Sequence, residues 1–227
     1  MGCVPLFQFL LLSVYDRTMN FKIDLHVHTK FSGDNYTEPE ETVINAIQRN
    51  LQGIVFTEHY SYEASEHAES LKEKYRNEIM IFRGVEFSAA EGHCLIFGVN
   101  TDKLSMSHAP IEDIVRIVSE SGGIVIPSHP FRGGTGIGSI VEKIKGFTAI
   151  EGYNGYSHHS QNMKAIEAAK ILNLPFTGGS DAHEPGEVGA CYTECYEEVT
   201  IDNFLTVLKA GNYQGVDTRK VSKAWVF

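Results

Sequence analysis

The segment FKIDLHVH, from Phe21 to His28, decides how the rest of the chain is interpreted. It is a short apolar run that predicts a β-strand, and it closes on two histidines two residues apart. Successive side chains on a strand point to opposite faces, so His26 and His28 share a face and direct their imidazoles at one point. Because imidazole is the commonest metal ligand, the segment indicates a metal site at a strand end.

The composition is that of a globular protein. The chain has 227 residues, of which 42% are hydrophobic and 21% charged, enough for one large domain or two small ones. A formal net charge of −10 argues against broad binding to nucleic acid. The four cysteines are Cys3, Cys94, Cys191 and Cys195, and the C-x3-C pair formed by the last two has no second pair to complete a zinc site. The set therefore predicts reduced thiols of a cytoplasmic protein and not a disulfide framework.

The first residues differ from the rest. Val4 to Tyr15 is strongly apolar but too short to span a membrane, and it lacks the basic region and cleavage site of a signal peptide. We expect residues 1–18 to be a leader outside the fold, with Met19 as the natural start. A membrane-associated leader is the alternative. Residues 19–227 are expected to form a single catalytic domain.

From Met19 onward, short apolar runs alternate with helical patterns, which predicts βα units and a largely parallel sheet. Thr37 and Glu40 have the spacing of a capping box at the first helix. The predicted strands are 21–28, 53–56, 79–87, 94–99, 124–126, 148–153, 175–177 and 192–195. The predicted helices are 37–50, 63–76, 110–121, 139–145, 161–172 and 201–210.

Histidines and acids gather where the apolar runs end, in HVH, TEH, GVE, SHP and GSDAH. In (β/α) barrels the functional residues sit at that end of the strands. Imidazole mixed with carboxylate suits Zn, Mn or Fe, and nine ligands indicate two or three divalent ions that share a carboxylate. The candidate ligands are His26, His28, Asp34, His59, Glu86, His93, His129, Asp181 and His183.

Together with Ser32-Gly33-Asp34, these segments resemble the PHP (polymerase and histidinol phosphatase) family of metal-dependent phosphoesterases. The resemblance runs from about residue 20 to 190 in the family's order, although Glu58 stands where many members have Asp. It implies an α/β fold, a distorted (β/α)7 TIM-like barrel with a trinuclear site at the C-terminal ends of the strands. It also implies three ion sites: His26, His28, Glu86 and Asp181; bridging Glu86 with His93 and His129; and Asp34, His59 and His183.

The resemblance favours a hydrolase in which a metal-activated water attacks a small phosphorylated metabolite or nucleotide monoester. Arg132, three residues after His129, is the candidate to grip a phosphate oxygen through its planar guanidinium, with Lys30 as a weaker one. Long nucleic acid and membrane are not expected as partners. The sequence does not specify the oligomeric state.

Three other functions stay open. They are a phosphodiesterase or exonuclease on short oligonucleotides, a non-catalytic metal-binding accessory domain, and an amidohydrolase. Tyr153 and Asn154 are expected at the rim of the site. The remaining histidines are assigned to the surface: His67, His108, His158 and His159.

Overall fold

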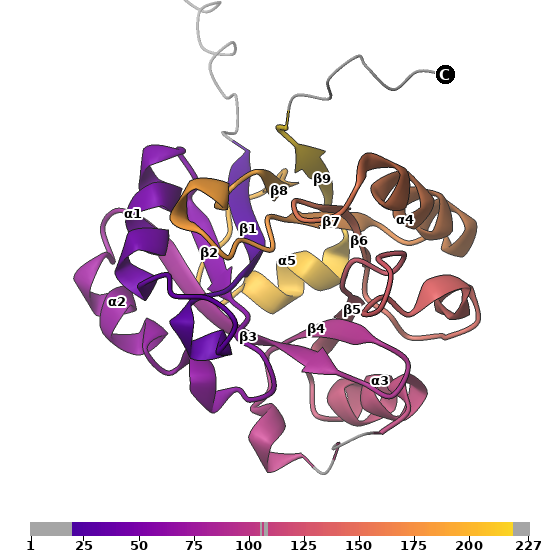
Figure 1. Ribbon diagram of the computed structural model, residues 1–227. Coiled ribbons are helices and arrows are strands. Elements are labelled where there is room, and N and C mark those ends of the chain that lie inside the picture. The colour runs from indigo at the N-terminus through magenta and orange to yellow at the C-terminus, as the bar shows by residue number, and fades with distance from the viewer. Residues whose placement is uncertain (1–19, 105, 107–108, 220–227) are drawn as a thin grey trace, which may run out of the picture.

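The computed structural model describes residues 20–219 except 105, 107 and 108, so the predicted leader (1–18) and His108 lie outside the described residues (Figure 1). The fold is mixed α/β and is built on a curled sheet. Seven strands follow the order β5-β4-β3-β2-β1-β8-β9, and β6 and β7 form a separate pair. The strands are β1 Phe21–Val27, β2 Gly53–Phe56, β3 Met80–Ser88, β4 His93–Phe97, β5 Ile124–Pro127, β6 Ile150–Asn154, β7 Phe176–Gly179, β8 Cys191–Cys195 and β9 Tyr213–Asp217.

Strands β1 to β7 follow one another around the curl in Figure 1. The β6–β7 pair lies between β5 and β1, because Thr148 N donates to Val125 O (3.0 Å) on one side and Asp181 N to His26 O (2.7 Å) on the other. The sheet is not uniformly parallel: β4 runs antiparallel to both β3 and β5. On the edge of β1 away from β2, β8 pairs antiparallel with β1 and β9 pairs antiparallel with β8; β9 was not predicted.

The helices follow the predicted pattern with shifted ends, but two of the predicted helices are partly or wholly 3-10 helix. The segment predicted as 63–76 divides into a 3-10 turn at Glu63–Ser65 and α2, and the segment at 139–145 is a 3-10 helix at Gly138–Glu142. The α-helices are α1 Pro39–Gln48, α2 Ala68–Lys74, α3 Ile111–Glu120, α4 His159–Leu172 and α5 Phe204–Ala210. Within the described part of the chain, no helix has the length and apolar character needed to cross a bilayer.

The predicted capping box at α1 is wrong. The N-cap is Glu38, which makes no side-chain capping bond, and Pro39 opens the helix. Thr37 instead donates its hydroxyl to His183 O at 2.7 Å. Its side chain therefore ties the loop after β1 to the turn after β7, a tertiary contact that outweighs the local cap.

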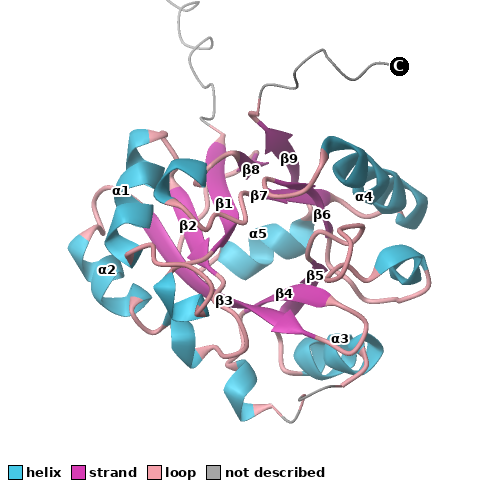
Figure 2. Cartoon of the chain, in the orientation of Figure 1, coloured by secondary structure: helices cyan, strands magenta, loops and turns pink. Residues whose placement is uncertain are grey.

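The hydrophobic core has an inner part and two outer parts. The inner part fills the curl of the sheet, and α5 closes it from one end through Phe204, Val207 and Leu208. Figure 2 shows α5 framed by the ring of strands. Outside the sheet, buried residues of α1 and α2 pack against β1 and β2, while α3 and α4 cover β4 to β6.

The register of β1 with β2 is irregular between Asp24 and Val27, next to the two histidines. Strict alternation would put Leu25 and Val27 on one face, yet Leu25 belongs to the inner core and Val27 to the outer core under α1. Bulges of this kind redirect side chains next to functional sites. Here the irregularity lets Leu25 pack inside the curl while His26 and His28 still meet above it.

Candidate metal centre

The first cluster consists of His26 from β1, His28 directly after β1, Glu86 from β3 and Asp181 after β7, all of them buried. Each imidazole Nε2 lies 3.3 to 3.4 Å from Glu86 Oε2 and Asp181 Oδ1, and the two Nε2 atoms are 2.9 Å apart. Around a tetrahedral zinc ion with ligands at about 2.1 Å, neighbouring ligand atoms are separated by about 3.4 Å. The donor spacing therefore fits a single divalent ion.

The second cluster shares Glu86 with the first. Its other members are His93 and His129, whose ring nitrogens lie 3.3 and 2.7 Å from Glu86 Oε1. Ser128 donates its hydroxyl to the same oxygen at 2.8 Å. One carboxylate thus presents Oε2 to the first cluster and Oε1 to the second.

The third cluster lies at the exposed side. His28, His59 and His183 form a group with metal-ligand spacing, and Asp34 Oδ2 lies 3.0 Å from His59 Nε2 and 3.1 Å from His183 Nε2. The structure therefore brings all nine predicted side chains together in three adjoining clusters. Their role as metal ligands stays a prediction.

Two buried oxygens in the first cluster have no hydrogen-bond partner. Glu86 Oε2 and Asp181 Oδ1 are each enclosed without a donor among the described residues. A buried carboxylate oxygen without a partner is costly, and native proteins rarely leave one. A bound cation would satisfy both oxygens, so the residues present fit divalent ions.

The charges in the clusters suit cation binding. Burial raises the pKa of Glu86 and of Asp181, but the neighbouring histidines, His26 foremost, outweigh burial and hold both pKa values well below the ordinary range. Burial lowers the pKa of His28, yet the adjacent carboxylates of Asp181 and Glu86 prevail and raise it to about 9. Burial and the nearby positive charge of His28 lower the pKa of His59 to about 4. Both carboxylates are therefore ionised at neutral pH.

Two candidate ligands sit on unusual backbone. His129 has φ of 31° and Asp181 has φ of 54°, a region that non-glycine residues rarely adopt. Each conformation is held by a hydrogen bond from the backbone amide of the residue: His129 N donates to Glu151 Oε2 at 2.6 Å, and Asp181 N donates to His26 O at 2.7 Å. Strain of this kind persists only where the surroundings enforce it, as they do here.

Glu151 on β6 is a site residue that the sequence analysis missed. It is 1% exposed, and its Oε1 lies 2.9 Å from His26 Nδ1. Asn154, expected at the rim, is buried and donates to both Glu151 Oε2 (3.0 Å) and Asp181 Oδ2 (3.1 Å). The sequence feature that could have identified Glu151 is an acidic residue inside the apolar run of a predicted strand. Asp24 has the same feature, and its carboxylate accepts from Ser180 N and Gly189 N, both at 2.8 Å.

Glu58 lies behind the clusters and holds the loop after β1. Its carboxylate accepts from the hydroxyls of Thr29 and Ser32, both at 2.5 Å, and Ser32 Oγ lies 2.9 Å from His28 Nδ1. His67 approaches Glu58 Oε1 at 3.5 Å. The solvent assignment of His67 was wrong, because its ring is largely enclosed and stacks on Phe31 at 4.7 Å.

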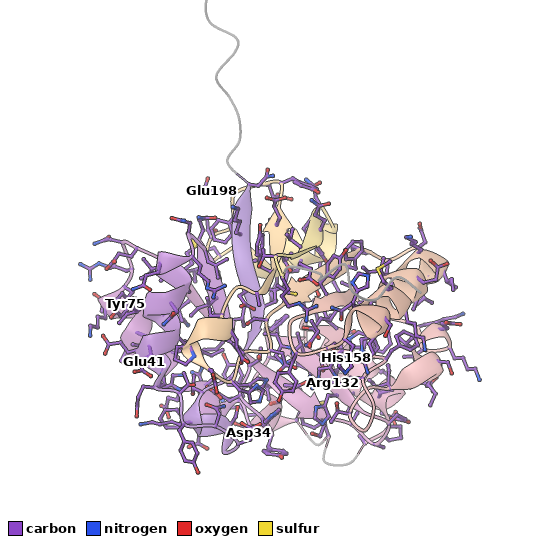
Figure 3. The ribbon with its side chains drawn as sticks, turned by 45° about the horizontal axis from the view of Figure 1, so that its top comes forward. Asp34, Glu41, Tyr75, Arg132, His158 and Glu198 are labelled. Carbon is purple, nitrogen blue, oxygen red and sulfur yellow. The ribbon has the colours of Figure 1, made fainter. Side chains whose placement is uncertain are left out.

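Arg132 reaches the first cluster. Its Nη1 donates to Asp181 Oδ2 at 2.5 Å and its Nε to Thr135 Oγ1 at 3.2 Å. Figure 3 shows Arg132 and Asp34 in the lower part of the molecule, away from Glu198. Lys30 instead pairs with Glu38 at 2.7 Å on the exposed surface.

Tyr153, the other residue expected near the rim, packs away from the clusters. Tyr153 packs edge-on against Phe176, with ring centroids 5.9 Å apart, so it faces its neighbouring strand. His158 and His159 are exposed as predicted.

Two family models match the chain. The family model for the PHP domain matches residues 24–127, and the model for the PHP-associated region matches residues 159–213. The chain belongs to the PHP family. This PHP chain is also similar to an uncharacterized protein of Methanocaldococcus jannaschii, MJ1587, which is 28% identical over 120 residues, 48% of this chain and 68% of the relative.

Solved structures share the fold of this PHP chain. PsfC from Pseudomonas syringae superposes with a TM-score of 0.66 at 18% identity, covering 88% of this chain and 92% of its own. A Bifidobacterium adolescentis protein provisionally named a metal-dependent phosphoesterase gives 0.60 at 16% identity, covering 86% and 97%. A Chromobacterium violaceum amidohydrolase, solved with bound sulfate and no metal, gives 0.58 at 19% identity, covering 79% and 92%.

Proposed function

We propose that this PHP protein is a metal-dependent phosphoesterase that hydrolyses a small phosphorylated metabolite or nucleotide monoester. The observation that carries the proposal is the set of three adjoining donor clusters joined by Glu86 and His28. We take strands β1 to β7 as a distorted (β/α)7 barrel with this centre at one end. The name of the B. adolescentis neighbour supports a phosphoesterase, and the family supports a hydrolase.

Two to three divalent ions of zinc, manganese or iron would be held by the nine side chains of the three clusters. These are the four residues of the first cluster with His93, His129, Asp34, His59 and His183. When bound, such ions supply positive charge for phosphate oxygens and lower the pKa of a water molecule. The chain itself keeps Glu86 and Asp181 ionised, and it keeps His59 neutral because burial lowers the pKa of that imidazole.

Arg132 is the residue we assign to phosphate binding. Its guanidinium carries five N–H donors, and the bonds to Asp181 and Thr135 occupy two of them. The others remain for a non-bridging phosphate oxygen beside the first cluster. Asp181 and Thr135 would hold the planar group in place, so less side-chain entropy is lost when the substrate binds.

The test is phosphate release by protein reconstituted with Mn²⁺ or Zn²⁺. Phenyl phosphate, nucleoside monophosphates, a diester and short oligonucleotides form the panel, with His28→Ala and Asp181→Ala as site variants and His159→Ala as the matched surface control. We expect monoester hydrolysis by the wild type and a rate that falls more than about a hundredfold in both site variants. Substitution of a residue that only hydrogen-bonds to a metal ligand already reduces metal affinity or activity about 10- to 100-fold, and loss of a ligand itself should cost more. Unimpaired turnover in either site variant, with bound metal unchanged, would overturn the assignment.

An amidohydrolase is the second candidate, favoured by the name of the C. violaceum neighbour. Both reactions need an activated water and a polarised oxygen, so the clusters serve either. An N-acyl amino acid added to the panel separates the two. Amide cleavage without phosphate release would transfer the proposal to C–N hydrolysis, and inactivity on every substrate with metal bound would favour an accessory domain.

A further inference from the structure

A cavity of about 370 Å³ adjoins the metal centre. It lies between the end of α1, the loop after β6, the turn after β7 and the end of β9. Its lining includes Arg49, Tyr156, Ser180, Glu187 and Arg219. The volume is at the lower end of the range for small-molecule sites, about 300 to 1,000 Å³, so one ring fits and an oligonucleotide does not.

Tyr156 connects this cavity to the metal centre. Its ring centroid lies 5.7 Å from the ring of His183 and 5.7 Å from the guanidinium carbon of Arg132. The side chain is 63% exposed although it is a large aromatic residue. Ser180, on the cavity wall, directly precedes Asp181. A molecule seated in the cavity therefore has its end within reach of the first and third clusters.

Arg219 fixes the position of Tyr156. Its Nη1 donates to Gly155 O (2.6 Å) and Ser157 O (2.9 Å), the carbonyls on either side of the tyrosine. Its Nε and Nη2 donate to the carboxylate of Asp217 at 2.9 and 2.7 Å. The aromatic face is thus presented by a held loop.

The polar groups of the cavity are balanced in charge. Arg49 donates from Nη2 to Gly186 O at 2.5 Å and keeps further N–H donors. Glu187 Oε2 accepts from His183 N (2.9 Å) and Glu184 N (3.1 Å), while Oε1 accepts from no group of the described residues. Arg219 is paired with Asp217, and Arg49 lines the cavity together with Glu187, so the formal charges of these four groups cancel. The cavity therefore suits a neutral, hydroxyl-rich group better than a second anion.

We propose that this cavity binds the sugar or polyol ring of a phosphorylated substrate, a proposal that rests on the phosphoesterase function above. The C–H face of the ring would pack on Tyr156, its oxygens would accept hydrogen bonds from Arg49 and Arg219, and a hydroxyl would donate to Glu187. The phosphate of the same molecule would then lie beside Arg132 and the donor clusters.

Binding is tested without turnover. The probes are the methylene phosphonate analogue of glucose 6-phosphate, which lacks the scissile P–O bond, and methylphosphonate, which lacks the sugar. Calorimetry on Mn²⁺-loaded protein gives the ratio of the two dissociation constants. We expect the sugar analogue to bind at least about tenfold more tightly in the wild type.

Matched variants assign that preference to the cavity. Tyr156→Ala removes the aromatic face and Arg49→Met removes the donors, and each should reduce the preference below about threefold. Tyr156→Phe keeps the ring and Arg116→Met changes an exposed arginine on α3, so both should retain it. A wild type without the preference, or a preference unchanged in both Tyr156→Ala and Arg49→Met, would overturn the proposal.

Failure of the subsite and failure of the function give different results. If the sugar preference is present and is lost in the variants while no phosphate ester is hydrolysed, the phosphoesterase assignment fails and the ring subsite holds. If phenyl phosphate is hydrolysed but the sugar analogue binds no better than methylphosphonate, the function holds and the subsite fails. Hydrolysis of glucose 6-phosphate with a kcat/KM above that of phenyl phosphate would support both.

Discussion

Glu151 Oε1 lies 2.9 Å from His26 Nδ1, and the other oxygen of the same carboxylate accepts from His129 N at 2.6 Å. In the neutral ring that a metal would need, a carboxylate beside Nδ1 keeps the proton on that nitrogen, so the lone pair of Nε2 faces the first cluster. One buried side chain therefore orients the imidazole of a candidate ligand in the first cluster and the backbone of a candidate ligand in the second.

We expect Glu151→Gln to weaken metal binding by about 10- to 100-fold. The amide has one acceptor and one donor, so it conflicts either with His26 Nδ1–H or with His129 N–H. Competition with a chromophoric chelator measures the affinity. Glu167→Gln, on the exposed surface of α4, is the control, and equal affinities in the two variants would contradict the orienting role.

Gly179→Ala should destabilise the metal-free protein by about 1 to 3 kcal/mol, the usual cost of overpacking. A Cβ at Gly179 would lie 2.5 Å from His26 Cβ and 2.9 Å from Glu151 Oε1. Gly133→Ala is the control because nothing lies within 4 Å of its Cβ position. Urea unfolding monitored by circular dichroism compares the variants, and identical midpoints would refute the close contact.

Metal binding should release protons. Burial lowers the pKa of His28 but its carboxylate neighbours raise it to about 9, so the metal-free imidazole is protonated at pH 7.5. A metal needs the neutral ring, so we expect about one proton or more released per ion, and an apparent affinity that rises with pH from about 6 to 9. A pH indicator in weak buffer measures the release, with His28→Ala as the comparison. An affinity independent of pH would contradict this prediction.

The described cysteines should be unreactive in the folded protein. Cys94, Cys191 and Cys195 are free and buried. Burial raises the pKa of all three thiols, that of Cys195 to about 12, so almost no thiolate exists at pH 8. Iodoacetamide followed by peptide mapping should label these positions only after unfolding. Rapid labelling of Cys94 in the native state would show that the β4 region opens.

The elements with a strong pattern were predictable from the sequence. The apolar spacing of α3 predicted the buried residues Ile111, Ile114, Val115 and Val118, which are buried in the structure. Most of the nine candidate ligands were predictable as a group because they follow or end an apolar run, and strand ends on one side of a curled sheet converge. His93 differs because it begins β4, which runs antiparallel to β3.

Contacts between distant segments were not predictable in the same way. Thr37 contacts His183 and His67 contacts Glu58, and each partner lies on another segment of the chain. The sequence next to Thr37 and His67 therefore does not show that the capping box is absent or that the imidazole is enclosed. Glu151 lies one layer behind the candidate ligands, where its role depends on which histidine is its neighbour in space. The register irregularity in β1 is likewise invisible to a pattern of strict alternation.

The closure of the inner core by α5 bears on the order of events during synthesis. The first strand of the candidate centre begins at Phe21, while the helix that closes the space beneath it ends at Ala210. Chains emerge from the ribosome N-terminus first. A nascent chain therefore exposes His26 and His28 long before their supporting core can close, and the candidate metal centre is complete only once the last helix has packed.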